Sequence, residues 1–386
     1  MSPKEIELLS ELTIFIPTYN RPLELERSVE YWRDLPVTVH ILDGSQKPWF
    51  PIGLLPGTNT ISYNHVPQNR GENSGENFQR RIVRSTDLAS TKYSALCSDD
   101  DIFTICGLKT ALKILKNDEA DAVVGKCAQY LFRDGIVEWK KINWDWRSDD
   151  LSLSRNFLDH FAGDSKGSFY YGIYTTSIWK KIRLSGVEYT FSHVGANENI
   201  SDYLTKILTR TLVINEYLWF TNYPDQRYPN IVGRSRRRFT YKYPKFSFWL
   251  NAEENIAERD LLVKALENGF KKFRPESDWH LANFFGRTIL LSKSPPAKIS
   301  AFIEFGVLFR ARILFLVSKL PKVVRKTLFN FLPRKYKALL RTDDFIDSRI
   351  PVIDIEDDDS ELTKAIRNWE RILLMPREEL RLRANI

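Results

Sequence analysis

The sequence of 386 residues is poor in several residue types that often define a class of protein. It has three cysteines, Cys97, Cys106 and Cys127, and no CxxC pair. A disulfide framework or a structural zinc site is therefore not expected, and this cysteine usage is typical of a reducing compartment. The five histidines show no HExxH or similar metal-binding spacing, which argues against the common zinc enzymes.

Long uncharged apolar runs are also missing. No stretch approaches the roughly 18 residues that a membrane-spanning helix needs. The first twelve residues place Lys4, Glu5, Glu7 and Glu11 ahead of any apolar run, which is not the basic-then-apolar order of a signal peptide. We therefore expect a cytoplasmic protein, with peripheral attachment to the inner face of the membrane as an alternative.

The net charge of +8 is concentrated in a few segments. Residues 226–245 contain seven basic residues and no acid, and residues 319–341 contain eight and no acid. Residues 342–361 then contain nine acids and one arginine. The remainder of the chain is close to neutral, so the charge indicates local binding surfaces rather than a generally basic protein. The hydrophobic content of 43% excludes global disorder.

The first 225 residues alternate between apolar, β-branched runs and segments with helical spacing. The expected strands are 12–17, 37–42, 93–97 and 122–124, and the expected helices are 23–35, 76–88 and 105–116. This alternation predicts an α/β fold with a mostly parallel sheet flanked by helices. Ligands of such sheets bind at the carboxyl ends of the strands, so we expect the catalytic domain to be residues 1–225 and its site to lie there.

Residues 226–386 have a different character, because they are aromatic-rich, basic and mainly helical in pattern. The expected helices are 252–268, 279–293, 298–319, 322–332 and 362–374. Residues 299–332 combine an apolar face with basic residues, a pattern typical of helices that bind an anionic membrane surface. Ordinary core helices with a solvated face would show the same pattern, and both interpretations stay open.

The strongest chemical signal is the triplet Asp99-Asp100-Asp101 at the end of a predicted buried strand. Adjacent carboxylates repel one another, and a cation relieves that repulsion. Mg²⁺ or Mn²⁺, shared between carboxylates and a substrate diphosphate, suits such a site. A solvated acidic turn that caps the next helix is the alternative.

Three motifs, Thr13–Pro22, Ile41–Ser45 and Leu96–Asp101, occur in the order and at about the spacing of the inverting family 2 glycosyltransferases. The chain resembles that family over roughly residues 12–225, and the resemblance implies a GT-A fold and a nucleotide-sugar donor. The residues implied to bind the donor are Pro17, Thr18, Tyr19 and Arg21 near the base, Asp43 on the base or ribose, Asp99 on the ribose, and Asp100 or Asp101 on the Mn²⁺ or Mg²⁺ that bridges the diphosphate. One departure is Ser98, which stands at the first position of the usual Asp-x-Asp-Asp pattern.

The same resemblance implies an acceptor site and a general base. Residues 170–179 resemble the acceptor loop, which includes Tyr171 and Gly172, and the helix that follows it. Residues 198–204 resemble the Glu-Asp segment, with Ser201 in place of the usual Glu, so Asp202 is the first candidate for the base and Glu198 the second. In the alternative interpretation, Ser201 and Asp202 cap a helix that begins near Tyr203.

Arginines supply candidate phosphate ligands, because a guanidinium pairs bidentately with phosphate oxygens. We expect one or more of Arg234, Arg236, Arg237 and Arg238 to fold over the donor as a lid; a solvated charge run or a membrane-facing patch would look alike. Arg80 and Arg81, on the predicted helix 76–88, are weaker candidates.

The sequence thus predicts a metal-dependent, inverting glycosyltransferase that moves a sugar from a nucleotide-sugar to a hydroxyl of a surface-glycan or lipid-linked acceptor. A sugar nucleotidyltransferase is disfavoured, because Pro17–Pro22 lacks the glycines of its phosphate-binding loop. A nucleic-acid-binding protein is disfavoured as well, since no helix-turn-helix or RNP-type motif is present.

Overall fold

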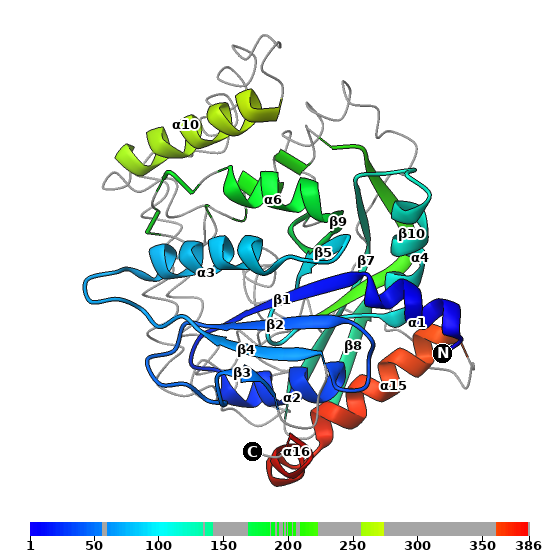
Figure 1. The fold of residues 1–386 in the computed structure, drawn as a ribbon. Helices are drawn as coiled ribbons and strands as arrows, with labels where there is room; N and C mark the ends of the chain where they lie inside the picture. The colour runs from blue at the N-terminus through cyan, green and yellow to red at the C-terminus, as the bar shows by residue number, and fades with distance from the viewer. Residues whose placement is uncertain are drawn as a thin grey trace, which may run out of the picture.

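The structure is a computed structural model, and it describes residues 1–55, 60–133, 136–141, 169–185, 187–189, 191–192, 196, 198, 200–202, 204–205, 209–222, 256–273 and 360–384. These residues form one mixed α/β unit in which helices cover both faces of a single twisted sheet (Figure 1). The predicted α/β class with a mostly parallel sheet is confirmed.

The sheet has ten strands, and their spatial order is β3-β4-β2-β1-β5-β9-β7-β10-β6, with β8 paired to β7. The strands are β1 (Leu12–Thr18), β2 (Thr38–Asp43), β3 (Gly53–Leu54), β4 (Ile61–His65), β5 (Tyr93–Leu96), β6 (Ile102–Phe103), β7 (Ala122–Arg133), β8 (Ile136–Lys141), β9 (Ile173–Thr175) and β10 (Thr211–Asn222). β1 pairs in parallel with both β2 and β5, and β2 pairs in parallel with β4. The carboxyl ends of these strands therefore meet at one edge, where the candidate site lies.

One part of the predicted acceptor loop forms a strand instead. β9 lies between β5 and β7 and is antiparallel to both. Its short apolar sequence, with Ile173 and Tyr174 fully buried, explains why the segment joins the sheet interior rather than a loop. Only the residues just before it, the 3-10 helix η3 (Phe169–Tyr171) and Gly172, remain outside the strands.

The described α-helices are close to the predicted ones where a prediction was made. They are α1 (Pro3–Ser10), α2 (Pro22–Trp32), α3 (Ser74–Leu88), α4 (Ile105–Lys116), α6 (Thr176–Leu184), α10 (Ile256–Phe273), α15 (Glu361–Leu374) and α16 (Arg377–Ala384). α3 begins with a capping box in which Asn73 and Glu76 satisfy each other's backbone N–H groups, so the start of this helix is specified locally. Thr104 caps α4 in a similar way.

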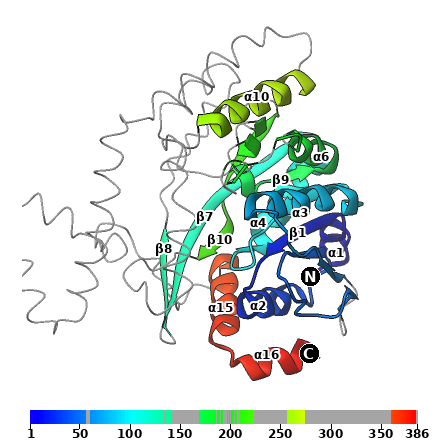
Figure 2. The ribbon, with the colours of Figure 1, turned by 90° about the vertical axis from the view of Figure 1, so that its left-hand side faces the viewer.

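Two hydrophobic cores lie on opposite faces of the sheet. In β1, Ile14 and Ile16 belong to the core beneath α1, α2, α4 and α15, whereas Phe15 belongs to the core beneath α3, α6 and α10. This alternation follows the two-residue period of a strand. Figure 2 shows α3, α6 and α10 on one side of the sheet and α2, α15 and α16 on the other.

The last described helices pack against the first domain. Trp369 of α15 is fully buried and meets the rings of Tyr31 and Tyr130 edge-on, at centroid distances of 5.6 and 5.9 Å. Glu26 of α2 is buried and accepts hydrogen bonds from Arg377 (2.8 Å) and Arg381 (3.0 Å) of α16. Residues 360–384, which the sequence assigned to the C-terminal region 226–386, are thus part of the same packed unit as residues 1–222.

Several sequence expectations fall on residues outside the described ranges. These are the arginines Arg234, Arg236, Arg237 and Arg238, the predicted helices 279–293, 298–319 and 322–332, and the acidic segment up to residue 359. No helix within the described ranges is both long and apolar enough to cross a membrane.

Candidate functional site

The loop that follows β1 brings Arg21 to the acid triplet. Asn20 adopts a left-handed backbone conformation with φ of 54°, which asparagine tolerates better than most residues. Its backbone N–H donates to the Ser45 hydroxyl in the loop after β2, at 2.8 Å. Arg21 then occupies the N-cap position of α2, followed by Pro22 at the first helical position. The turn therefore directs the Arg21 side chain across the sheet edge toward β5.

Arg21 bridges two members of the triplet. Its Nη1 lies 2.6 Å from Asp99 Oδ1, and its Nη2 lies 2.5 Å from Asp100 Oδ2. The Thr18 hydroxyl donates to the other oxygen of Asp99 at 2.6 Å. Three predicted donor-binding residues, Thr18, Arg21 and Asp99, are thus in direct contact, and the only cation touching the triplet within the described residues is this guanidinium.

Burial raises the free-energy cost of ionising the carboxylates of the triplet. Asp99 is 3% and Asp101 4% exposed. Desolvation raises the pKa of Asp99 to about 7, although the Arg21 charge and the Thr18 hydrogen bond oppose the rise. Desolvation and the neighbouring Asp100 raise the pKa of Asp101 in the same direction. Burial disfavours the charge of Arg21, but Asp99 and Asp100 outweigh this and raise the pKa of Arg21. The site is therefore short of positive charge.

Two residues that the sequence did not single out also hold the triplet. Asn222, the last residue of β10, donates its backbone N–H to Asp101 Oδ1 at 3.1 Å and its side-chain amide to Asp100 Oδ2 at 3.5 Å. The Tyr130 hydroxyl donates to the Asp100 carbonyl at 2.5 Å. The strand ending at Asn222 was not predicted, but its apolar run Leu218–Phe220 followed by a polar pair was a usable signal.

The chemistry of these donors fits a hard divalent cation. The site offers carboxylate and amide oxygens, which Mg²⁺ and Mn²⁺ prefer, and a cation would offset the raised pKa values of Asp99 and Asp101. Within the described ranges, no three His, Cys, Asp or Glu side chains converge as a ready-made metal site. A bound metal would need ligands from phosphate or water, as Mg²⁺ sites with one or two carboxylates commonly do.

Asp43 lies at the end of β2, as predicted, and both of its carboxylate oxygens accept hydrogen bonds from nearby residues of the protein. It has no exposed surface. One carboxylate oxygen accepts from the backbone N–H (2.8 Å) and hydroxyl (2.5 Å) of Ser45, and the other accepts from the Tyr63 hydroxyl. These bonds order the loop after β2, which in turn holds Asn20. The contact between Asp43 and a base or ribose stays a prediction.

The other residues expected near the base differ in exposure. Pro17 is half-buried within β1, and its partner in β2 is Leu42. Tyr19 is 36% exposed, and its hydroxyl lies 3.4 Å from Gln68 Oε1. The Tyr19 ring is thus partly exposed, one residue after Thr18, which bonds Asp99.

Arg80 and Arg81 have separate environments on α3. Arg80 forms an ion pair with Glu72 at 2.9 Å, so its charge is already balanced by an acid of the loop before α3. Arg81 is buried and donates to the Thr18 carbonyl at 2.8 Å; desolvation lowers its pKa to about 10, against the pull of Asp43 and Asp99. Arg81 therefore fixes the backbone at the end of β1 through this hydrogen bond. A Cβ at the nearby Gly44 would lie 2.3 Å from Asn77 Oδ1, so a larger residue there would displace the Asn77 side chain.

The predicted acceptor residue Tyr171 joins the triplet to the candidate base. Its hydroxyl is hydrogen-bonded to that of Ser98 at 2.8 Å, and its ring stacks on Trp219 at 4.4 Å. Burial raises the pKa of Tyr171, and Asp101 and Glu198 raise it further. The Tyr171 phenol thus lies within electrostatic reach of both Asp101 and Glu198. Ser98, the departure from the family pattern, is the residue that makes this link.

Glu198 and Asp202 are helical, and their i, i+4 spacing places them on one face. Residues 196, 198 and 200–202 are all in helical conformation, so the alternative in which Ser201 and Asp202 cap a helix starting near Tyr203 is wrong. The helix begins earlier. Burial raises the pKa of Glu198 to about 7, Asp202 adds to this, and Arg183 opposes it. A carboxyl that titrates near neutrality suits proton transfer.

Comparisons with known proteins give a limited result. No family model matches the chain, and no curated protein matches it. Among solved structures, the fold is similar to S. aureus TarS 1–349, with 14% identity and a TM-score of 0.38 over 73% of this chain and 90% of that one. The same fragment solved in complex with UDP-GlcNAc gives 15% identity and a TM-score of 0.35 over the same shares. At these values the comparison assigns neither a family nor an activity.

Proposed function

We propose that this protein is a metal-dependent, inverting glycosyltransferase with a GT-A type site, as the sequence motifs predict. The observation that supports the proposal is that two groups of acids act on the same pair of tyrosines. Asp101 and Glu198 are both within electrostatic reach of Tyr171, whose hydroxyl is hydrogen-bonded to that of Ser98, and Glu198 and Asp202 are both within electrostatic reach of the neighbouring Tyr170. A donor diphosphate and an acceptor hydroxyl need two such groups side by side.

On the donor side, Tyr19 is the candidate to stack on the base, and Asp99, held by Thr18 and Arg21, is the candidate to bind the ribose. Asp100 keeps more solvent contact, with a side chain 20% exposed, so we assign the divalent cation to Asp100, with Asp101 behind it. When bound, Mn²⁺ or Mg²⁺ would neutralise the charge that develops on the leaving diphosphate. Arg21 already lies at hydrogen-bond distance from both carboxylates and would share that charge with the metal.

On the acceptor side, Glu198 and Asp202 form a coupled pair of carboxylates. In the proposed step, Asp202 takes the proton of the acceptor hydroxyl. The oxygen of that hydroxyl forms the new bond to the anomeric carbon at the same time. The bond from that carbon to the diphosphate oxygen breaks, and the electron pair leaves with the nucleoside diphosphate. Glu198, with a pKa of about 7, shares the proton with Asp202. Tyr171 and Gly172 line the path of the acceptor.

Two further parts of the proposal concern residues outside the described ranges. Arg234, Arg236, Arg237 and Arg238 are proposed to close over the diphosphate, since arginine pairs bidentately with phosphate oxygens. The basic segment 299–332 is proposed to bring the protein to an anionic membrane surface, which would suit a lipid-linked acceptor. A surface glycan is the alternative acceptor.

Donor binding is the most direct test. The melting temperature is measured with UDP-, GDP- and dTDP-sugars, each with Mn²⁺ and with EDTA. We expect at least one donor to raise the melting temperature by several degrees only when Mn²⁺ is present, and we expect the Asp100→Asn variant to lose this increase. An unchanged melting temperature with every nucleotide-sugar, with and without metal, contradicts the proposal. An equal increase in EDTA contradicts its metal dependence alone.

A further inference from the structure

Arg183 is a buried arginine in the interior of the second core. It lies on α6 and is 4% exposed. Its guanidinium carbon stands 4.2 Å from the ring centroids of both Tyr170 and Trp179. Its Nη2 donates to the Tyr170 carbonyl at 3.0 Å. A cation held between aromatic faces and bonded to a carbonyl is well fixed in position, and the carbonyl that it holds belongs to the turn carrying Tyr171.

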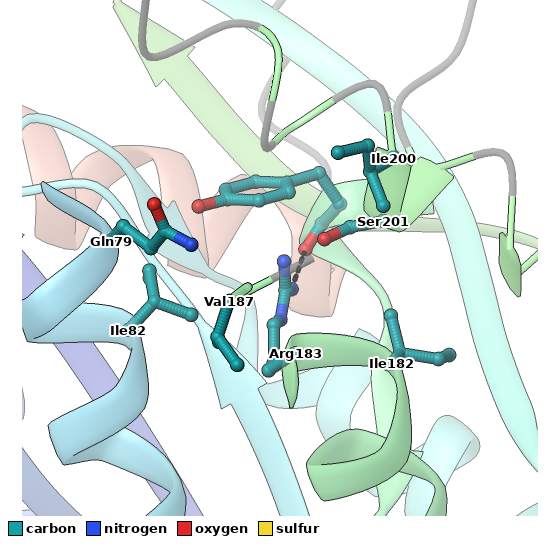
Figure 3. A pocket seen from close by; sticks show the side chains of 8 residues that line it. Gln79, Ile82, Ile182, Arg183, Val187, Ile200 and Ser201 are labelled. Carbon is teal, nitrogen blue, oxygen red and sulfur yellow. Dashed lines mark hydrogen bonds between the residues drawn. The ribbon is translucent and has the colours of Figure 1, made fainter. Parts of the chain in front are cut away.

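Two of the Arg183 nitrogens, Nε and Nη1, are buried and have no hydrogen-bond partner among the described residues. They face a cavity whose polar lining also includes Gln79 and Ser201 (Figure 3). The cavity encloses about 20 Å³ of space for the centres of water molecules. A polar cavity needs roughly 10–15 Å³ on that measure to hold one water. Leaving the three N–H groups of Nε and Nη1 unsatisfied is costly, and the cavity is large enough for one water molecule to bond to some of them.

The charges around Arg183 are those of the proposed acceptor site. Ser201, which lines the cavity, is the residue before Asp202. The groups that face Glu198 are Asp202 on its own helix, Arg183 from α6, and the phenols Tyr170 and Tyr171 from η3. Among these four groups, Arg183 alone carries positive charge. Its guanidinium therefore compensates a half-buried pair of carboxylates.

We propose that Arg183 is a positioning residue for the transfer reaction: its guanidinium ties the Tyr170–Tyr171 turn to the helical residues that carry Glu198 and Asp202. The tie is a direct hydrogen bond at the turn, and at the helix it runs through the cavity that Arg183 and Ser201 both line. The inference rests on the function proposed above, because it concerns the residues assigned to the acceptor side. Within the described residues, the hydrogen bond and ring contacts of Arg183 involve Tyr170, Tyr174 and Trp179 and none of the triplet.

The primary test follows the Glu198 carboxyl by NMR in the full chain labelled at glutamate side chains. The Glu198 signal is assigned by its loss in Glu198→Gln. We expect its titration midpoint near pH 7 in the wild type and roughly one unit higher in Arg183→Met, because an opposite charge nearby favours the ionised carboxylate. Arg183→Lys keeps the charge, and its midpoint should stay near the wild-type value even though its rate falls.

Transfer rates against pH give the second readout. The acid limb of the rate profile should move up by the same amount in Arg183→Met, while the melting-temperature increase caused by donor and Mn²⁺ stays as in the wild type. Arg84→Met, which removes a half-exposed arginine from α3, is the matched control and should change neither. A rate that falls equally at every pH, with an unmoved Glu198 midpoint, overturns the inference. If Arg183→Met does not fold, Arg183→Lys decides: a midpoint shifted as far as one unit contradicts a role through charge.

The two proposals fail in different ways. If the proposed function is wrong, the wild type transfers no sugar from any donor, yet the Glu198 midpoint still depends on Arg183. If the role of Arg183 is wrong, the wild type transfers sugar and binds donor with Mn²⁺, and the midpoint and acid limb of Arg183→Met coincide with those of the wild type.

Discussion

The two acid groups of the site each have one arginine, and the two arginines are held differently. Arg21 is 38% exposed at its side chain and bridges Asp99 and Asp100 at the sheet edge. Arg183 is 4% exposed and lies between the rings of Tyr170 and Trp179. The first guanidinium can be moved or joined by another cation at little packing cost. The second is part of the core and cannot be moved without opening it.

Under the proposed function, this difference matches what the two halves of a transfer site have to do. A donor site must take up and release a diphosphate with its metal, so its counter-charge should be exchangeable. A general base needs a fixed environment, because its pKa depends on every neighbouring charge. The arrangement of Arg21 and Arg183 therefore suggests that the triplet side adapts to its ligand and the Glu198–Asp202 side is preorganised.

The largest effect should come from the donor side. Asp100→Asn removes the most accessible carboxylate of the triplet, and we expect transfer to fall about 10³-fold, since metal and diphosphate lose their main protein ligand. The melting-temperature increase with donor and Mn²⁺ should vanish as well. Asp87→Asn, an exposed acid at the end of α3, is the control. Normal donor binding by Asp100→Asn would mean that the metal lies elsewhere.

Next in size is the loss of the base. Asp202→Asn should lower transfer about 10²-fold, because a positioned general base contributes roughly that much or more, while donor binding stays within about twofold. Steady-state rates and donor-induced melting shifts, measured on the same preparations, separate the two quantities. If donor binding is lost together with transfer, Asp202 belongs to the donor side and the comparison above fails.

Protein stability should show the cost of burying Glu198. Its folded-state pKa of about 7 lies above the ordinary glutamate value of 4.5, so the folded protein binds this proton more tightly than the unfolded chain. The group's stabilising contribution is therefore complete below pH 4.5 and is lost as the pH rises through 7. Glu198→Gln should be about 2 kcal/mol more stable than the wild type at pH 8, allowing for partial solvent screening, and equal to it near pH 4. Urea denaturation at both pH values measures this, and equal stability at pH 8 contradicts the assignment.

The smallest effect should come from the exchangeable arginine. Arg21→Met removes the charge that opposes protonation of Asp99, so the pKa of Asp99 should rise above about 7. Donor affinity at pH 7 should then fall about tenfold, and most of this loss should be recovered at pH 8.5, where Asp99 is again ionised. Arg21→Lys retains the charge and should lose less. Titrations of donor at both pH values measure the effect. A pH-independent loss would mean that Arg21 acts only through the diphosphate charge, as proposed above, and not through the pKa of Asp99.

The sequence predicted the parallel strands and the placement of the triplet at their carboxyl ends, because both depend on local patterns. Leu12–Thr18 is buried at every position except the half-buried Pro17, and two residues separate the end of Tyr93–Leu96 from the acids. The class of fold follows from such patterns. β9 was missed because three residues are too few to show a period, and its place between β5 and β7 is set by tertiary contacts alone.

The contacts of the site's arginines could not be predicted from local sequence patterns either. Arg21 was singled out by its motif, but its bridge between Asp99 and Asp100 depends on the left-handed turn at Asn20. Arg183 carries no motif at all, and its sequence context, Lys-Lys-Ile-Arg-Leu, is typical of a solvated helix face. Asn222 likewise acquires its contacts with Asp100 and Asp101 only through the pairing of β10 with β7. Residues brought together from distant segments are not visible in a local pattern.

The packing of α15 and α16 against α2 also constrains how the chain can fold. Glu26 and Arg377 are 351 residues apart in sequence, so α2 lacks its cover of Trp369 and the α16 arginines until synthesis has passed Arg381. During synthesis the apolar face of α2, including Tyr31 and Trp32, is exposed to water or to other chains. Such long-range closure slows folding. Arg21, which sits at the start of this helix, is therefore expected to reach its place beside the triplet only in the last stage of folding, and an incomplete chain would bind donor poorly even with every motif residue present.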